Sequence, residues 1–466
     1  MNKNYEPTAC TTLLIGKGAS ADGSTIIART EDSPNGAFNA KKMIVVKPSE
    51  QPRQYQSTIS KVVIDLPEKP IAYTATPDAD ETHGIWGEAG INADNIAMSA
   101  TETITTNARV LGADPLIETG IGEEDMLTLV LPYIHSAREG VRRLGDLLER
   151  YGTYEMNGIA FSDVNEIWFL ETIGGHHWLA QRVPDDMYVT VPNQRGIEKF
   201  DLNDQDNFMA SADMTEFINE NQLQLDEELN SRIMFGTHTE MDHVYNTPRA
   251  WAIQKMLTPQ VEHNPMDDDI PFAQKPEHKL TIEDVHMVMS NHYQGTVYDP
   301  YGKLGDETTR NLFRPIGINR NCELSVLQLR PNMPLEKMAI QWLAYSSMPF
   351  TTLVPVYTRV LDIPEYYKNT TVRVTSESYY WANRLIAAMA DANYSEIIPF
   401  VERYQLNTLG MAHQHIHTVD QDSQIKLEDA NQKFASEIKE ELETLLNQVL
   451  LTRSNLMQNG YSRSDN

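Results

Sequence analysis

Three short runs of β-branched and apolar residues, separated by turn residues, occur within the first fifty positions of this chain. They occupy residues 10–16, 24–29 and 42–46. The turn sequence Asp22-Gly23 separates the first two runs, and Pro48 follows the third. Runs this short with such turns are typical of antiparallel hairpins. The pattern predicts that residues 24–29 fold back along residues 10–16.

Helical periodicity then interrupts the strand pattern before strands return. Residues 123–131 begin with acidic side chains, which suit a helix N-terminus. Residues 137–151 carry apolar side chains at a spacing of three to four, as an amphipathic helix does. Strands followed by helices and more strands predict a layered α+β architecture. Four later runs are interpreted as a strand meander: 159–162, 166–171, 178–183 and 188–191.

The C-terminal part is predicted to be helical and to belong to the same domain. Residues 195–245 are polar and acidic and are interpreted as loops and surface helices. Residues 376–392 and 427–451 are the strongest helix candidates. The apolar positions of the second helix could pack in the core or form a subunit interface, and we favour core packing. No internal repeat or low-complexity segment divides the chain.

The charge balance restricts the partners of this chain. Its 466 residues include 38 Lys and Arg against 66 Asp and Glu, a net charge of −28. Such a surface repels nucleic acid and anionic membranes. Residues 1–9 lack the apolar core of a secretory signal, and no apolar run approaches the ~18 residues that span a bilayer. We therefore expect a cytoplasmic protein with no nucleic-acid or membrane partner.

Two motifs that bind cofactors or metals in other proteins have simpler interpretations here. Residues 16–21 match a degenerate GxGxxA dinucleotide fingerprint, but a strand-like run follows instead of a helix, so we predict a hairpin turn. His413, His415 and His417 would share one face of a strand and could bind a metal. Solvated histidines in a polar C-terminal loop are the favoured alternative. We expect neither a cofactor nor a metal.

Cys10 is the residue with the clearest chemical potential. The only other cysteine is Cys322, so neither a disulfide framework nor a CxxC metal pair is possible. A thiol becomes a useful nucleophile as its thiolate. If residues 1–9 were removed, the α-amine of Cys10, with an unperturbed pKa of roughly 7.7–8.0, could serve as the general base. The alternative, a buried structural cysteine, is favoured by residue type alone.

Arg29 and Asp32 change that balance. Antiparallel pairing of the first two strands would bring the end of the second strand beside Cys10. Arg29 could then stabilise the thiolate, and Asp32 could hold the α-ammonium group or the arginine. The alternative is a surface ion pair.

Several sequence blocks resemble one known family. The most specific are the blocks around Cys10, Arg29 and Lys41, at residues 9–17, 22–33 and 41–46. Shorter blocks extend the match over most of residues 9–360: 84–92, 189–194, 245–251, 291–299, 342–345 and 355–357. The sequence thus resembles the dipeptidase A (PepD-like) cysteine peptidases. These are N-terminal nucleophile (Ntn) hydrolases, related to secernins, penicillin V acylases and bile salt hydrolases.

The resemblance implies a role for each matching residue. Cys10 matches the nucleophile, and Arg29 and Asp32 match the residues that flank it. Asn193 matches an asparagine of the oxyanion hole, for which a neutral amide donor is suited. Two further residues match with less direct roles, Asn92 near that hole and Arg249 as a distal support.

The resemblance also implies a fold and a reaction. The fold would be an αββα sandwich of two stacked antiparallel sheets, with residues 1–9 as a leader, 10–360 as the catalytic core and 361–466 as its helical C-terminal part. The reaction would be metal-independent hydrolysis of dipeptides through a thioester, by a homo-oligomer. The alternatives are an acylase of the penicillin V or bile-salt type and a catalytically inactive partner-binding homologue.

Overall fold

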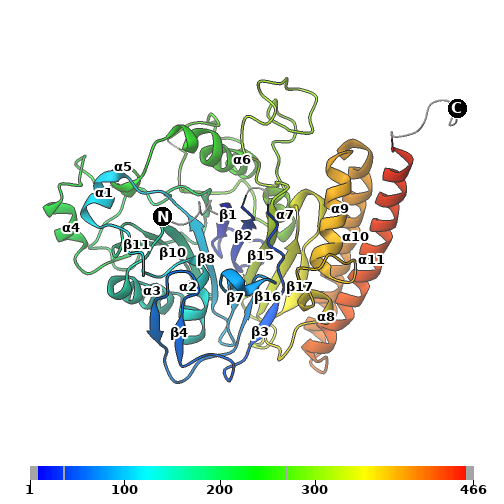
Figure 1. Ribbon diagram of the computed structural model, residues 1–466, viewed down its shortest axis with the longest axis horizontal. Helices are drawn as coiled ribbons and strands as arrows, with labels where there is room; N and C mark the ends of the chain where they lie inside the picture. The colour runs from blue at the N-terminus through cyan, green and yellow to red at the C-terminus, as the bar shows by residue number, and fades with distance from the viewer. Residues whose placement is uncertain (1–8, 35–36, 269, 458–466) are drawn as a thin grey trace.

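A computed structural model describes residues 9–34, 37–268 and 270–457 (Figure 1). Its two main sheets are antiparallel. The larger sheet has, in spatial order, β14 (Ala273–Gln274), β12 (Tyr188–Val191), β1 (Ala9–Ile15), β2 (Thr25–Asp32), β15 (Asn321–Leu329), β16 (Ala339–Tyr345) and β17 (Val354–Tyr357). The smaller has β13 (Phe208–Ala210), β11 (Trp178–Arg182), β10 (Ile167–Thr172), β9 (Asn157–Ser162), β8 (Ala97–Thr103) and β7 (Ala89–Ile91).

Helices and two small ribbons complete the described fold. The ribbons pair β3 (Ile44–Val46) with β6 (Tyr73–Ala75), and β4 (Gln54–Gln56) with β5 (Val63–Asp65). The α-helices are α1 (Ala108–Ala113), α2 (Glu123–Val130), α3 (Ala137–Tyr151), α4 (Met214–Glu220), α5 (Ser231–Phe235), α6 (Thr247–Leu257), α7 (Ile282–Met289), α8 (Glu365–Lys368), α9 (Tyr379–Asp391), α10 (Tyr394–Gln421) and α11 (Leu427–Asn455). Short 3₁₀ turns are η1 (Glu81–His83), η2 (Leu131–Tyr133) and η4 (Met348–Phe350), and η3 (Asp242–Asn246) is a π-helix.

The first hairpin forms as the sequence predicts. β1 and β2 pair antiparallel with Ala9 opposite Asp32 and Cys10 opposite Glu31. Every residue of both strands is buried, because β12 and β15 flank the hairpin and both of its faces are covered, one by the smaller sheet and the other by helices. In the connecting turn the carbonyl of Gly16 accepts from the amide of Ala19 at 2.8 Å. The GxGxxA segment is therefore a hairpin turn, as predicted.

The predicted meander holds for three strands and fails at the fourth. β9, β10 and β11 are neighbours in the smaller sheet, but β12 crosses to the larger sheet and pairs with β1. β13, which lies in a segment interpreted as loops and surface helices, takes the place beside β11. The four residues of β12 are all buried, so their apolar pattern suits either sheet equally well and cannot reveal the crossing.

The two main sheets bury an apolar layer between them. Leu14 of β1 and Ile27 of β2 share one buried cluster with Phe169 and Leu179 of the smaller sheet. Residues two apart on a strand point to the same side, so Cys10, like Leu14, faces the smaller sheet.

Helices cover the outer faces of both sheets. Leu13 of β1 points away from the smaller sheet into a cluster that includes Phe434 of α11, and Figure 1 shows α9, α10 and α11 side by side on that flank. On the other flank, Leu144 of α3 packs in a cluster with Phe161 of β9. The α+β class predicted from the sequence is confirmed.

The C-terminal helices confirm one prediction and correct another. α9 and α11 coincide closely with the two predicted helices, and the apolar positions of α11 are buried against this same chain, which confirms core packing. The segment with the three histidines was expected as a loop or strand, but it lies within α10. His415 packs on Phe434 with ring centroids 4.8 Å apart, whereas His413 pairs with Glu283. On a helix, positions two apart point to opposite sides, so His415 points away from His413 and His417, whereas a strand would have aligned all three.

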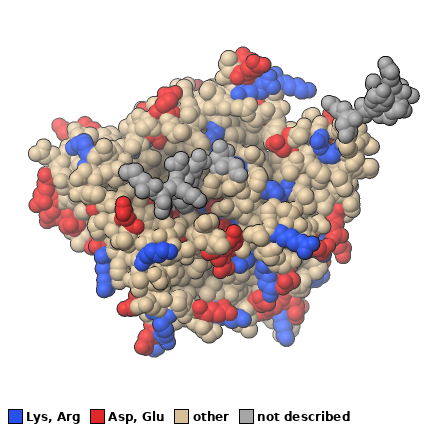
Figure 2. Space-filling view, in the orientation of Figure 1, with Lys and Arg blue, Asp and Glu red and all other residues tan. Residues whose placement is uncertain are grey.

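Three further observations concern membranes, metal ions and surface charge. In the part of the chain that the structure describes, no helix has the length and apolar character needed to cross a membrane. Among these same residues, no group of three or more His, Cys, Asp or Glu side chains could hold a metal ion. Acidic side chains gather at the left end of the face in Figure 2, where Figure 1 places α4.

Candidate active site around Cys10

Cys10 lies at the start of β1, fully buried, with both its sulfur and its backbone nitrogen in contact with polar side chains. The sulfur contacts Arg29 Nη2 at 2.8 Å. The backbone N–H donates to Asn193 Oδ1 at 3.1 Å. The two groups that an N-terminal nucleophile would use are therefore each held by a separate residue.

Strand register explains why Arg29 meets the sulfur. Arg29 of β2 pairs with Thr12, and Thr12 lies two residues after Cys10, so all three side chains share one face of the sheet. Arg29 also donates to Glu123 at 2.7 Å and forms an ion pair with Glu88. Burial opposes the guanidinium charge, but Cys10, Glu88 and Glu123 outweigh it and hold the pKa of Arg29 well above its ordinary value. A permanently charged group beside the sulfur favours the thiolate.

A buried charge cluster extends from Arg29. Lys41 is fully buried and contacts Glu31 at 2.6 Å and Asp78 at 2.7 Å, with Glu88 at 3.8 Å. Burial and the neighbouring Glu88 carboxylate raise the pKa of Glu31. Sequence reasoning identified Arg29 but did not identify Glu88 or Glu123 as its partners. The acidic start of the helix at Glu123 was interpreted only as a match to the helix dipole.

Asn193 and Arg249 hold the backbone of Cys10 by hydrogen bonds and also contact each other. Asn193 follows β12 and Pro192 with φ of 58°, a left-handed conformation that asparagine tolerates better than most residues. Its Nδ2 donates to the carbonyl of Thr103 at 2.9 Å. Its Oδ1 accepts from Arg249 Nη2 at 2.8 Å as well as from Cys10. This geometry fixes the Asn193 amide in one orientation.

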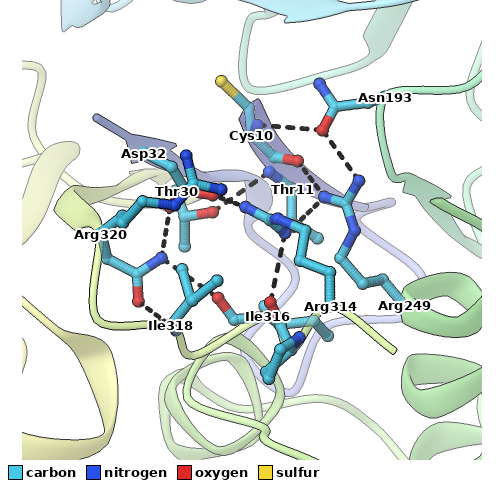
Figure 3. A network of polar contacts seen from close by, with 12 residues as sticks. Cys10, Thr11, Thr30, Asp32, Asn193, Arg249, Arg314, Ile316, Ile318 and Arg320 are labelled. Carbon is cyan, nitrogen blue, oxygen red and sulfur yellow. Dashed lines mark hydrogen bonds and ion pairs between the residues drawn. The ribbon is translucent and has the colours of Figure 1, made fainter. Parts of the chain in front are cut away.

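Arg249 acts as a clamp on the start of β1. It extends from α6, directly after the π-helix η3, and donates to the carbonyl of Cys10 and to Thr11 Oγ1, the latter at 2.8 Å. It also donates to Asn246 Oδ1 at 3.0 Å. Figure 3 shows its guanidinium group reaching the Cys10 backbone, while the sulfur points away from it. Arg249 therefore supports the backbone around the candidate nucleophile and does not contact the sulfur.

Asp32 lies close to Cys10 but has a different partner from the one expected. The sequence suggested that it would hold either an α-ammonium group or Arg29. In the structure its carboxylate contacts Arg314 and accepts from Asn321 (Figure 3). Asp32 and Asn321 are 289 residues apart along the chain, so no local pattern could reveal this contact.

Asn92 is the one predicted site residue that the structure does not bring to Cys10. Its Nδ2 donates to the carbonyls of Leu131 and Ile134 at 3.0 and 2.8 Å, and its Oδ1 accepts from the amides of Asp94 and Ile96. These contacts lie beyond the far end of α2 from Glu123, and an eight-residue helix is about 12 Å long. Asn92 organises the turn between β7 and β8, which gives an asparagine after an apolar strand a structural reason.

The chain is similar to a peptidase family and to proteins named as dipeptidases. The chain matches the profile described as peptidase family C69 over residues 9–407. It is 51% identical to a protein named dipeptidase from Bifidobacterium longum, over 98% of this chain and 100% of that protein. It is 54% identical to a probable dipeptidase A from Streptococcus pyogenes serotype M3 over 98% and 100%. It is also 45% identical to dipeptidase A from Lactobacillus helveticus, over 98% and 99%. This chain therefore belongs to peptidase family C69.

Proposed function

We propose that this chain is a cysteine dipeptidase of the Ntn-hydrolase type in which Cys10 is the nucleophile. The observation that carries the proposal is the pair of contacts at Cys10, with Arg29 on the sulfur and Asn193 on the backbone nitrogen. The relatives named dipeptidases, which align over nearly their whole length, support the substrate class.

Removal of residues 1–9 would make Cys10 the first residue of the mature protein. The family match covers residues 9–407, so Cys10 lies at its very start. The new α-amine would occupy the place of the present amide nitrogen, within hydrogen-bond distance of Asn193 Oδ1. Such an amine has an unperturbed pKa of roughly 7.7–8.0, so it can accept a proton near neutral pH.

The reaction then has two halves. In the first, the Cys10 sulfur attacks the scissile carbonyl, the α-amine receives the thiol proton, and that proton passes to the leaving amine, which departs as an amino acid. In the second, water attacks the thioester, the α-amine takes a proton from the water, and the thiol is regenerated as the second amino acid leaves. Arg29 stabilises the thiolate before it attacks and again when the thioester bond breaks.

The remaining predicted residues position these groups. Asn193 holds the amine through Oδ1, and its Nδ2 group is our candidate for an oxyanion donor together with a backbone amide. Arg249 fixes the Cys10 carbonyl and Asn193. Asp32 holds Arg314 beside the start of β1. Asn92 has no part in this proposal, because its side chain is used in a distant turn.

The proposal extends to the whole chain. The two packed sheets with helices on both outer faces agree with the αββα arrangement of Ntn hydrolases. Residues 1–9 would be the leader, 10–360 the catalytic core and 361–466 its helical C-terminal part. We further propose a homo-oligomer in the cytoplasm that acts without a metal or cofactor.

Replacement of Cys10 tests the proposal. We expect Cys10→Ser to fold with an unchanged melting temperature but to lose dipeptide hydrolysis by about 100-fold or more, because a hydroxyl is far less nucleophilic than a thiolate. Cys322→Ser controls for the loss of a buried sulfur, since Cys322 is also buried, with its sulfur 2.8 Å from Ser33 Oγ, and this variant should keep dipeptide hydrolysis. Full dipeptide hydrolysis by Cys10→Ser overturns the proposal. Wild-type activity on penicillin V or conjugated bile salts, without dipeptide hydrolysis, replaces it with an acylase.

A further inference from the structure

Two arginines from the segment before β15 lie beside the start of β1 and have no assigned role. Arg320 donates from Nη1 to the carbonyl of Ser33 at 2.8 Å and from Nη2 to Tyr245 Oη at 3.0 Å. The Arg314 guanidinium contacts Asp32 and lies over the ring of the same Tyr245, 5.0 Å from its centroid. Tyr245 and Arg320 are both partly exposed. Arg314 and Arg320 form a cationic pair at the edge of the Cys10 site (Figure 3), with Tyr245 in contact with both.

The positive charge around this pair exceeds the negative charge. Among the residues that the structure describes, Arg320 has no carboxylate within 4.0 Å, and its two hydrogen-bond acceptors are neutral. Asp32 is the carboxylate partner of Arg314, whose buried Nε has no hydrogen-bond partner among the same residues. Burial and the neighbouring Arg320 lower the pKa of Arg314 to about 9. A site with two guanidinium groups and one carboxylate attracts a further anion.

The opposite face of the hairpin has the reverse balance. Glu31 lies on the face of Cys10, whereas Asp32, one residue on, points to the other face. On the Cys10 face, the cations Arg29 and Lys41 contact four carboxylates, those of Glu31, Asp78, Glu88 and Glu123. The start of β1 thus separates a carboxylate-rich side from an arginine-rich side. This polarity matches a zwitterion more closely than a neutral substrate.

The proposed maturation would open a path between the two sides. Asp32 pairs with Ala9, the last residue of the proposed leader. Loss of residues 1–9 leaves the edge of β2 at Asp32 and Ser33 next to the new amine of Cys10. In a dipeptide the scissile carbonyl and the terminal carboxylate are one residue apart, at most about 3.6 Å. A dipeptide attacked by the Cys10 sulfur therefore carries its carboxylate close to the start of β1, where both arginines lie.

From this arrangement we infer that Arg320, supported by Arg314 and Tyr245, binds a carboxylate group of the substrate. The inference rests on the proposed dipeptidase function. A planar guanidinium group can donate two parallel hydrogen bonds to a carboxylate. Such a contact would place the scissile bond directly before a C-terminal residue, as it is in a dipeptide.

Substitution of Arg320 tests the inference with paired substrates. We expect Arg320→Gln to lower kcat/KM for a dipeptide by about tenfold or more, mainly through KM, and to leave the already slow hydrolysis of the same dipeptide amide unchanged. The kcat/KM of Arg320→Lys for the dipeptide should lie between those of wild type and Arg320→Gln, because an ammonium group keeps the positive charge but cannot donate two parallel hydrogen bonds. Arg359→Gln, at an exposed arginine after β17, is the matched control and should behave as wild type.

Further substrates identify the source of the carboxylate. If Arg320 binds the terminal carboxylate, the kcat/KM of Arg320→Gln falls equally for dipeptides with Asn and with Asp side chains. If Arg320 binds a side-chain carboxylate, kcat/KM falls only for the dipeptides that contain Asp. Equal losses on the dipeptide and its amide, or no loss on either, overturn the inference and leave the dipeptidase proposal intact. A wild-type protein that cleaves no dipeptide overturns both. Melting temperatures of both Arg320 variants confirm that folded proteins are compared.

Discussion

At the scale of the residue, the arrangement at Cys10 depends on how one arginine is shared. Arg29 contacts the sulfur of Cys10 and the carboxylates of Glu88 and Glu123, all buried. The carboxylates keep the guanidinium group charged and in place, and the guanidinium group in turn stabilises the thiolate. Removing Arg29 affects both the fold and the nucleophile, and the two effects can be measured separately.

We expect Arg29→Gln to lower the free energy of unfolding by about 3–5 kcal/mol, because two buried carboxylates lose their cation. In the folded fraction, alkylation of Cys10 by iodoacetamide should require a higher pH than in wild type. Urea denaturation measures the first effect, and mass spectrometry of the alkylated residue measures the second. Arg29→Lys should restore part of the free energy of unfolding and part of the shift in the pH of alkylation, because it keeps a positive charge. An unchanged pH profile for alkylation in Arg29→Gln would show that the arginine does not act on the thiolate.

The sequence predicted which site residues lie together where they are close along the chain. Cys10, Arg29 and Asp32 lie on one hairpin, so their proximity follows from strand pairing. Arg314 and Arg320 were not identified, because the chain brings them to that hairpin from nearly three hundred residues away through β15, and only the three-dimensional structure shows it.

At the scale of the element, α2 is unusual because its acidic first turn is buried. Glu124 accepts hydrogen bonds from Ser57 and Tyr154, and Asp125 accepts one from Tyr55. Burial, and then the neighbouring Asp125, raise the pKa of Glu124 to about 8, and burial raises the pKa of Asp125 to about 6. The sequence predicted this helix from its acidic start, but burial of that start depends on the β4–β5 ribbon that contributes Tyr55.

These shifts give the protein a pH-dependent stability. Between about pH 4.5 and 8 the folded state keeps a proton on Glu124 that the unfolded state has lost, so the free energy of unfolding falls as the pH rises through this window. Glu124→Gln removes that titration and leaves a neutral group of the same shape, whose oxygen can accept one hydrogen bond and whose nitrogen can donate to the other hydroxyl. We expect wild type to lose about 1 kcal/mol or more relative to the variant between pH 5.5 and 8.5. Urea denaturation at the two pH values measures this, with Glu118→Gln, at an exposed carboxylate, as the control. If the free energy of unfolding falls equally in wild type and Glu124→Gln between pH 5.5 and 8.5, Glu124 is not the group that titrates.

At the scale of the whole molecule, the sequence predicted the class of the fold and not its connections. The α+β class, the first hairpin and the helices α9 and α11 follow from local periodicity and turn residues, whereas the histidine segment within α10 was expected as a loop or strand. The crossing of β12 to the larger sheet does not, because four buried residues have the same pattern in either sheet. That crossing carries Asn193 to Cys10, so it is decisive for the site.

The central claim is that Cys10 becomes the N-terminal residue of the active protein. The most direct measurement is the intact mass of the purified wild-type protein, taken on the same sample whose dipeptide hydrolysis has been measured. We predict the mass of a chain that begins at Cys10, with residues 1–9 absent. An active sample whose mass retains residues 1–9, or lacks only Met1, would contradict the claim, because the proposed base would still be part of a peptide bond.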